Sequence, residues 1–325
     1  MVTLQQPTYS KPKRKISLNQ QPKWLRNAIL LGNQFHYRKK IPIIHNTINI
    51  FVLMLILLEA LGVSYSSTFL PTLVFIPLGS IAFGLIQFML FILVVHEASH
   101  NMFIVRKNQQ QAIFWNRCFG WIISTFYGME YTKHWEVGHQ VHHIDAIESH
   151  DPQNCPNTIY MGKELFKYTL IVLLLPGYFQ FVRKYDDCQA PKKYGVNIKL
   201  ITGQVIMWAT FIYLSTVYIS WEVPVAAFLG VQVLSVLNQF KIAMEHGGEV
   251  GFRENPLMRS CSSFFPLRRI IMPLNITLHF EHHLNYCVPW YDLLKYHNEL
   301  RQIIPELVQK DVFKSNSEVW KQISK

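Results

Sequence analysis

The sequence predicts an all-α integral membrane protein, and three observations lead to this prediction. Half of the 325 residues are hydrophobic and only 16% are charged, whereas a soluble domain carries about 25% charged residues. Two long apolar blocks contain almost no charge, and eight histidines gather in three short groups outside them. We therefore expect four transmembrane helices in two hairpins, with interfacial helices and a cytoplasmic helical cap that holds a di-metal site.

The first 45 residues form a basic segment that we expect to lie at a membrane surface. Nine of the 31 Lys and Arg residues lie before residue 46, and this stretch contains no Asp or Glu. A net charge of +11 is also typical of nucleic-acid-binding proteins, but basic residues before a long apolar run are typical of a tail that faces anionic lipids. We therefore expect a membrane partner and no nucleic acid, with an interfacial part from about Trp24 to Leu31.

Residues 46–95 predict the first pair of transmembrane helices. They contain a single charge, Glu59, and a break where three serines and Pro71 gather. Each half is about 20 residues long, which is enough to cross roughly 30 Å of hydrocarbon at 1.5 Å per residue. We expect spans at about 47–66 and 72–95.

Residues 200–240 predict the second pair of transmembrane helices. Glu222 is the only charge in this block, and the block divides at Ser220–Pro224. The same argument from length predicts spans at about 198–219 and 224–243.

The stretch between the two pairs is expected to lie at the membrane surface. Residues 96–165 are polar and rich in histidine, but 112–129 is apolar and aromatic, and too short to span, so we expect an interfacial helix there. Residues 166–182 are apolar as well, but Pro176 and Gly177 interrupt them. We expect this segment to lie on the membrane or to dip into it.

The basic residues predict one orientation for all of these elements. The N-terminal segment, the central segment 183–199 and the C-terminal part all carry Lys and Arg, whereas the two turns between paired spans carry none. By the positive-inside rule, both termini and all histidine groups then lie on the cytoplasmic side. The expected division is a basic segment 1–45, a membrane domain 46–310 and a C-terminal tail 311–325.

Three short groups carry eight of the 14 histidines at spacings that suit a metal site. They read H-x-x-x-H at 96–100 and H-x-x-H-H at 139–143 and 279–283. Positions i, i+3 and i+4 share a helix face, so each group is expected to point its imidazoles in one direction. With His246 beyond the fourth span, nine imidazoles suffice for two metal ions with four or five ligands each, and imidazole suits Fe, Zn, Cu or Ni. The candidate ligands are His96, His100, His139, His142, His143, His246, His279, His282 and His283.

Carboxylates close to these groups are candidates for orienting the ligand rings. A metal-bound histidine commonly donates its other N–H to a carboxylate. Asp151 and Glu281 are the better candidates for this role, and Asp145 and Glu148 are weaker ones.

The other histidines give weaker signals. We expect His36, His45 and His297 to be ordinary polar residues in a wet interface. His134 and His150 lie closer to the second group, which makes them secondary ligand candidates.

At these residues the chain resembles the membrane fatty acid desaturase and hydroxylase superfamily. The resemblance implies a mushroom-shaped molecule with four spans under a cytoplasmic cap, in which the nine histidines hold two iron ions. Some acyl-CoA desaturases of this superfamily use an Asn four residues before the single extra histidine, and here that position is Ile242. The resemblance covers about residues 45–305 and rests on HEASHNMF at 96–103, GHQVHH at 138–143, SHDPQNCP at 149–156, MEHGGE at 244–249 and HFEHHLNYCVPWYDL at 279–293.

The resemblance also implies O2-dependent oxidation of an unactivated C–H bond in a lipid. Removal of two hydrogens from a fatty acyl chain gives a cis double bond, and this desaturase reaction is our first hypothesis. The alternative is a hydroxylase or ketolase that acts on a carotenoid, sphingolipid or alkane. A non-enzymatic metal-binding membrane protein is a third hypothesis, but a carrier is expected to place polar ligands within the membrane, where these spans have almost none.

Two further expectations concern the substrate path and the electron donor. Five aromatic residues are plausible liners of a narrow apolar tunnel between the spans and the cap. The chain has neither a fused cytochrome b5 motif nor a dinucleotide fingerprint, so we expect a separate donor, ferredoxin or cytochrome b5, that a basic cap attracts. The tunnel candidates are Phe88, Phe91, Trp121, Phe126 and Trp208.

Overall fold

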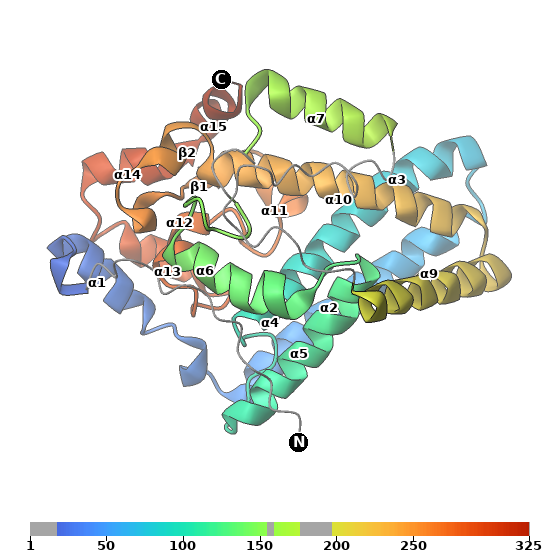
Figure 1. Cartoon of the computed structure of the whole chain (residues 1–325), viewed down its shortest axis with the longest axis horizontal. Helices are drawn as coiled ribbons and strands as arrows, with labels where there is room; N and C mark the ends of the chain where they lie inside the picture. Colours follow the sequence, from blue (N-terminus) through green and yellow to red (C-terminus); the bar gives the residue numbers. More distant parts are fainter. Residues whose placement is uncertain (1–17, 155–158, 176–196, 325) are drawn as a thin grey trace.

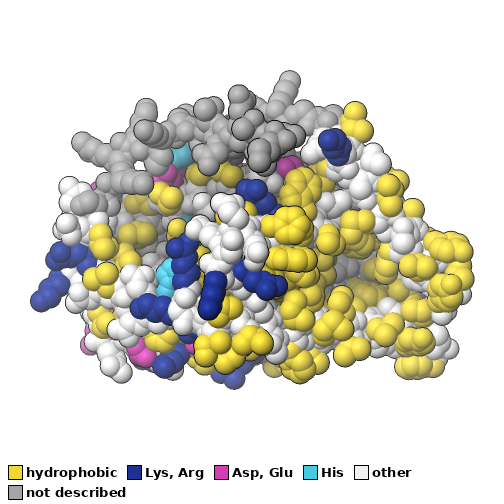
Figure 2. Space-filling view, turned by 90° about the horizontal axis from the view of Figure 1, so that it is seen from below, with side chains coloured by type: hydrophobic (Ala, Val, Ile, Leu, Met, Phe, Trp, Pro, Cys, Tyr) yellow, Lys and Arg dark blue, Asp and Glu magenta, His cyan; other side chains and the backbone are white. Residues whose placement is uncertain are grey.

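The molecule has a bundle of long helices at one end and a cap of short helices at the other. The computed structural model describes residues 18–154, 159–175 and 197–324. In Figure 1 the long helices extend toward the right and the short helices gather on the left. Figure 2 shows hydrophobic side chains over the right-hand part of the surface, whereas most Lys and Arg side chains lie to the left. This division agrees with an apolar membrane region under a polar cap.

Four helical runs are long and apolar enough to cross a membrane, which agrees with the expected number and positions. The second run continues through a π-helical segment, and both the second and the fourth run extend a few residues beyond their expected ends. They thereby carry histidines past the apolar stretch. The runs are α2 (Pro42–Ser66), then α3 (Thr72–Leu90) with η3 (Phe91–His96) and α4 (Glu97–Ser99), α9 (Ile198–Tyr218) and α10 (Glu222–His246).

The second and fourth runs form the inner pair of the bundle. In their most apolar stretches 67% and 50% of the residues are buried, against 17% in α2 and 6% in α9. The inner helices come close at Gly84 and Gly230, where a methyl group added to Gly230 would lie 2.9 Å from Phe83 Cβ. Small residues allow such an approach between membrane helices. The Gln87 side chain also donates a 2.9 Å hydrogen bond to the Ala227 carbonyl across the same contact.

The two hairpin turns lie side by side at one end of the bundle. The Thr72 hydroxyl donates a 2.8 Å hydrogen bond to Glu222 Oε1 and so joins the turns, which appear on the right in Figure 1. Both inner runs begin at these turns, so their histidine-bearing ends, with His96 and His246, lie together at the opposite end. Which side of a membrane this end faces stays a prediction.

Two amphipathic helices flank the bundle, α5 (Gln109–Phe126) and α7 (Gly162–Leu174). The Asn108 side chain accepts hydrogen bonds from the first free amides of α5 and sets its beginning. Its end is held against α9 because the Trp208 indole donates a 2.9 Å hydrogen bond to the Phe126 carbonyl. This helix corresponds to the expected interfacial segment 112–129.

The cap is built from the chain that follows each inner run and from the N-terminal segment. Leu25 and Ala28 of α1 are fully buried, and the Tyr296 hydroxyl of α13 donates to the Ala28 carbonyl. The cap elements are η1 (Leu18–Gln20), α1 (Lys23–Gly32), η2 (Tyr37–Lys39), η4 (Tyr131–Val137), α6 (Gly138–Ile144), η6 (Gly248–Phe252), η7 (Pro256–Met258), α11 (Arg268–Ile271), α12 (His279–Leu284), α13 (Leu293–Leu300), α14 (Glu306–Val312) and α15 (Asn316–Ile323).

A short parallel sheet in the cap was not part of the expected fold. It pairs β1 (Ser262–Phe264) with β2 (Phe313–Ser315). Three-residue strands give no alternation that could be recognised in a sequence, and their pairing depends on contacts across about 50 residues. Because β2 precedes α15, the pairing draws the end of the chain onto the cap, where Gln322 donates to the carbonyl of Gly247 at the end of α10.

Several expectations concern segments outside the described residues. These are the first part of the basic N-terminal segment up to residue 17, the end of the segment 166–182 with Pro176 and Gly177, and the basic residues between 183 and 193. The division of the chain at residues 45 and 310 also stays a prediction.

Candidate metal centre

Nine buried histidines meet in two adjacent groups where the bundle joins the cap. In each group, one nitrogen from every ring lies within 4.8 Å of the others. None of the nine residues exposes more than 4% of its surface. The five-histidine group is His96, His100, His139, His143 and His282, and the four-histidine group is His142, His246, His279 and His283.

Each inner helix contributes histidine rings to one of the two groups. His96 ends η3 and His100 follows α4 directly, so both enter the five-histidine group from the second run. His246 is the last residue of α10 and enters the four-histidine group. The packing of the two inner helices against each other therefore helps to set the distance between the two histidine groups.

The cap helices α6 and α12 each serve both groups. In α6, His139 and His143 join the five-histidine group, whereas His142 joins the other. In α12 the assignment is reversed: His279 and His283 join the four-histidine group, whereas His282 joins the five-histidine group. The expectation that all three rings of a group share one face is therefore wrong. At 3.6 residues per turn, consecutive residues such as His142 and His143 point about 100° apart, so each helix can reach a metal ion on either side.

Two π-helical segments precede the first two histidine groups. The segment η3 runs directly into His96, and η4 runs directly into α6. A π-helix is wider than an α-helix and changes the direction of the side chains that follow, and such segments are frequent at functional sites. The sequence does not reveal η3, because its residues before His96 are uniformly apolar and show no periodicity.

The distances between ring nitrogens match those of ligands that share a cation. The Nε2 atoms of His96 and His282 are 3.0 Å apart, and those of His246 and His279 are 2.9 Å apart. Two nitrogens that each lie about 2.1 Å from one metal ion, at an angle of about 90–110°, are roughly 3.0–3.4 Å from each other. The rings are thus arranged at coordination spacing.

Hydrogen bonds to the outer nitrogens orient several of the rings. His139 Nδ1 donates to Gln153 Oε1 and His246 Nδ1 donates to the Arg259 carbonyl, both at 2.6 Å. An acceptor at Nδ1 keeps the proton there and leaves the lone pair on Nε2. The lone pairs therefore point into the groups, as metal binding requires.

Two rings have buried nitrogens without a hydrogen-bond partner among the described residues. Within the described residues, neither nitrogen of His100 or of His283 has a hydrogen-bond partner, although both side chains are buried. Buried polar groups are normally paired. The donor set of neutral imidazoles, with orphaned nitrogens in both groups, therefore fits two metal ions.

Asp151 is connected to the four-histidine group as expected for a carboxylate that orients a ligand. Its Oδ2 accepts hydrogen bonds from His142 Nδ1 at 2.7 Å and from the Ile147 amide at 3.0 Å, and its Oδ1 accepts from the Gln153 amide. Ile147 has a φ of 62°, which is rare for a β-branched residue. The bond to Asp151 helps to hold this strained turn beside the site.

Glu281 differs from the expectation, because its carboxylate does not bind a ring of either group in the described structure. It accepts hydrogen bonds from His297 Nδ1 of α13 and from the Ser262 hydroxyl of β1. Glu281 therefore fixes α12 as a whole, by linking this ligand-bearing helix to two neighbouring elements.

The expectation of a wet interface is wrong for His45 and His297. His45 is 1% exposed and His297 is 5% exposed. The Tyr291 hydroxyl donates to His45 Nδ1 at 2.7 Å, while His45 Nε2 donates to the Met102 carbonyl. Residues distant in the sequence cover both histidines, which local reading could not reveal. His36 is half-buried.

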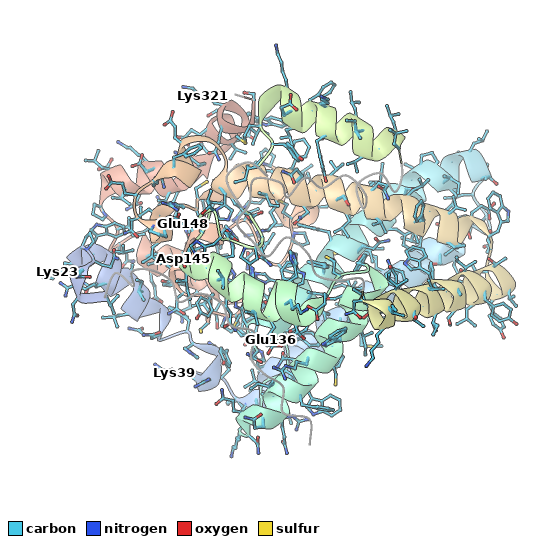
Figure 3. All side chains as sticks on the ribbon, in the orientation of Figure 1. Lys23, Lys39, Glu136, Asp145, Glu148 and Lys321 are labelled. Carbon is cyan, nitrogen blue, oxygen red and sulfur yellow. The ribbon has the colours of Figure 1, made fainter. Side chains whose placement is uncertain are left out.

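The weaker candidates lie outside the two groups. His150 Nε2 donates to Asp145 Oδ2 at 3.1 Å, and Glu148 pairs with Arg259 at 2.5 Å, which steadies the loop whose carbonyl orients a ligand ring. Asp145 and Glu148 appear beside α6 in Figure 3. His134 belongs to the wall of the cavity that reaches the groups.

Burial keeps six of the nine histidines in the neutral form. For the six rings that lie outside the spans, burial lowers the pKa well below the ordinary 6.5, and neighbouring imidazoles lower the pKa further. Neutral imidazole is the form that binds metal ions. These rings are His100, His139, His143, His279, His282 and His283.

An apolar cavity opens onto both histidine groups. Its apolar wall includes Phe91 and Ile92 of η3, Leu234 and Ile242 of α10, and Trp135 of η4. An apolar wall that ends at potential metal ligands suits an alkyl chain held next to a redox centre. The polar part of its lining consists of His96, His139, His142, His246 and His279 together with His134, Gln153, Asn154, Ser235, Asn238 and Lys241.

A second pocket lies close by along α10. Phe126 and Trp208 line this pocket, whereas Phe91 lines the first cavity. Of the other expected tunnel residues, Phe88 is buried in the core and Trp121 packs against it. The five aromatics thus do not form one continuous wall.

Comparison with known families gives one match. A family model described as "Fatty acid desaturase" matches residues 70–313, which include all nine histidines of the two groups. No curated protein and no solved structure matches the chain.

Proposed function

Because the chain belongs to the fatty acid desaturase family, we propose that it is an O2-dependent di-iron enzyme that introduces a cis double bond into a fatty acyl chain. The family makes it a membrane oxidoreductase of the desaturase or hydroxylase type. The observation that carries the proposal is the apolar cavity whose polar end is formed by histidines of both groups.

The donor set is compatible with iron, and the resemblance to the desaturase superfamily favours iron over the other metals that imidazole binds. Two iron ions in adjacent groups, when bound, supply the redox chemistry that activates O2. The overall reaction takes one hydrogen from each of two neighbouring methylenes. With O2, two electrons and two protons it yields a double bond and two molecules of water.

The residues of the cavity hold the acyl chain and exclude water. We place the reacting methylenes between Phe91 and Leu234, next to the histidines. Phe91 and Trp135 pack edge to face with ring centroids 4.8 Å apart, and Trp135 in turn contacts His139. Rigid aromatic walls restrict where the chain can bend, and positioning of this kind governs which bond reacts.

The second pocket supports a path for the rest of the acyl chain. It contains Val231 of α10, one turn before Leu234 in the first cavity. Tyr127 of this pocket lies against Phe91 with ring centroids 5.9 Å apart. We propose that the chain enters between α5, α9 and α10 and passes Tyr127 to reach the histidines.

A separate protein supplies the electrons in this proposal. Basic side chains are exposed on the cap, among them Lys23 and Lys39, which Figure 3 labels on its left side. An acidic ferredoxin or cytochrome b5 is attracted to such a surface. The cap and both termini then face the cytoplasm, as the positive-inside rule predicts.

The experiment is the lipid profile of a host that expresses the protein. We expect new unsaturated acyl chains with the wild type and none with His139→Gln, and gas chromatography with mass spectrometry locates the double bond. A new hydroxyl or keto group instead would favour the alternative reaction. Unchanged lipids together with a protein that binds zinc but no iron would favour a non-enzymatic role.

The donor is tested with purified protein in lipid vesicles. We expect double-bond formation only after reduced ferredoxin or cytochrome b5 is added. Turnover without any donor protein would contradict this part of the proposal.

A further inference from the structure

The two histidine groups differ in the number of nitrogens that they offer. The five-histidine group has five and the four-histidine group has four. One helical turn before His246 the chain has Ile242, whose side chain offers no donor atom. Ile242 is buried and lines the apolar cavity, so the smaller group needs another donor if its ion is to have as many ligands.

The residue directly before His246 has a carboxylate next to the four-histidine group, outside the set of four whose ligand nitrogens all lie within 4.8 Å of one another. Glu245 lies in the last turn of α10 and is 2% exposed. Its Oε2 is 3.3 Å from His279 Nε2, and that nitrogen is 2.9 Å from His246 Nε2. Both distances agree with neighbouring donors about 2.1 Å from one ion at an angle near a right angle.

The other oxygen of this carboxylate has no partner. Within the described residues Glu245 Oε1 accepts no hydrogen bond, although it is fully buried. An unpaired buried carboxylate oxygen is strongly destabilising. A cation in the four-histidine group removes this cost, because either oxygen of the carboxylate can bind it.

A partly buried lysine holds the carboxylate in place. Lys241 Nζ lies 2.6 Å from Glu245 Oε2, one helical turn earlier on α10. A lysine this close to a divalent ion is favourable only if an anion lies between the two charges. Glu245 lies in that position, between Lys241 and His279.

The end of α10 is also fixed in its backbone. The Cys261 amide donates a 2.9 Å hydrogen bond to the Glu245 carbonyl, and Gln322 of α15 donates to the carbonyls of Ala243 and Met244. A helix end is the part most prone to fray. These bonds restrain Glu245 and His246 together, as two ligands of one ion require.

We propose that Glu245 is the fifth donor of the four-histidine group, with Lys241 as the residue that positions it. This inference rests on the proposed di-iron centre. It assigns each ion five protein donors, of which one group has only nitrogens and the other has a carboxylate. The two ions are then chemically unequal, because a carboxylate is a harder, anionic ligand.

The test is Mössbauer spectroscopy of the purified, iron-loaded protein and of Glu245→Gln. We expect two doublets in the wild type, of which Glu245→Gln shifts or removes only the one assigned to the four-histidine group. The affinity for that second iron falls about 10–100-fold, as for loss of a strong contact at a metal site. Glu249→Gln, which changes an exposed acid four residues later, leaves both doublets unchanged.

Further variants make the result independent of folding. Glu245→Asp keeps the charge that pairs with Lys241 but shortens the side chain, so we expect a folded protein with an altered second doublet. Lys241→Met is expected to retain both irons but to change the same doublet. Unchanged iron affinity and unchanged doublets in both Glu245 variants would overturn the inference.

The outcomes separate this inference from the proposed function. A wild type that binds no iron and forms no double bond contradicts the proposed function. A wild type that binds two irons and desaturates lipids, while Glu245→Gln and Glu245→Asp match its spectrum, contradicts only the role of Glu245.

Discussion

The five-histidine group and the four-histidine group use the same cap helices but different inner helices. Both take rings from α6 and α12, while the former is completed by the end of the second run and the latter by the end of α10. Their supports differ as well. Asp151 and the Arg259 carbonyl orient rings of the four-histidine group, whereas Gln153 orients His139 of the other group and Glu97 lies 3.3 Å from its His96.

The two groups therefore differ in the side chains and carbonyls that surround their rings. A carboxylate and a backbone carbonyl polarise the rings of the four-histidine group, and Glu245 lies beside it. The five-histidine group has a neutral amide at His139, an aromatic ring, Tyr286, stacked on His100 with centroids 5.1 Å apart, and the buried Glu97 carboxylate 3.3 Å from His96 Nδ1. The following experiments test or refine the comparison, beginning with the largest expected effect.

Removing one ring from each group is the most severe test. His282 and His283 are neighbours on α12 that belong to different groups, so His282→Gln and His283→Gln should each lose one iron, but not the same one. We expect double-bond formation to fall by at least about 100-fold in both variants. Iron analysis and Mössbauer spectra of the purified proteins identify the remaining ion.

The control is His150→Gln, which alters a half-exposed histidine outside both groups and should keep two irons and full activity. If His282→Gln and His283→Gln lost the same spectral component, the division into two groups would be wrong.

Acid should destabilise the metal-free protein through both groups. The pKa of each of the six buried rings is lowered in the folded protein, so the unfolded chain takes up protons first as the pH falls below 6.5. The contribution of these rings to the free energy of unfolding is therefore full above pH 6.5, and it decreases as the pH falls below that value. From pH 7 to 6 the loss is about 0.7 kcal/mol per ring that stays neutral.

Thermal unfolding of chelator-treated protein in detergent measures this loss. Four of the six rings belong to the five-histidine group, so that group contributes the larger share. A melting temperature that did not change between pH 7 and 6 would show that the rings are not buried in the neutral form.

The supports of the two groups can be compared directly through Asp151 and Gln153. Asp151→Asn removes the charge beside His142. Four N–H groups now donate to Asp151, and an asparagine has only one oxygen to accept them. We therefore expect about 10–100-fold weaker binding of the iron in the four-histidine group. Gln153→Leu should weaken the other iron toward the lower end of that range, because a neutral acceptor is lost. Metal titration with competing chelators measures both. Equal effects on both irons in either variant would contradict separate supports.

The close crossing of the inner helices, on which both groups depend for their position, limits the size of the residue at Gly230. Gly230→Ala places a methyl group 2.9 Å from Phe83 Cβ and 3.0 Å from the Gly84 nitrogen, and we expect a cost of about 1 kcal/mol in unfolding free energy. The matched control is Gly62→Ala, since a methyl group at Gly62 meets nothing within 4 Å. Thermal unfolding compares the two variants. A larger loss in Gly62→Ala would contradict the close crossing.

Much of the site could be read from the sequence because its signals are local. The spacing within each histidine group and the position of His246 after an apolar run identified all nine rings that the structure brings together. Asp151 was found for the same reason, since it follows its ring by nine residues. Glu245 was missed, although it is the neighbour of His246, because an acid at a helix end is usually solvated.

Other features depend on segments that meet only in the folded chain. The burial of His45 depends on Tyr291 and Met102, and the partners of Glu281 lie on β1 and α13. A local pattern does not contain such contacts.

By itself the sequence determined the membrane class, the four spans and the set of imidazoles, because hydropathy and helical spacing depend on neighbouring residues. The tertiary structure decided how the rings divide into two groups. Consecutive residues on one helix point about 100° apart, and only the packing of α6 and α12 against the inner helices determines which of their rings joins which group. It also decided that a buried carboxylate lies beside the smaller group, because that depends on where α10 ends relative to α12.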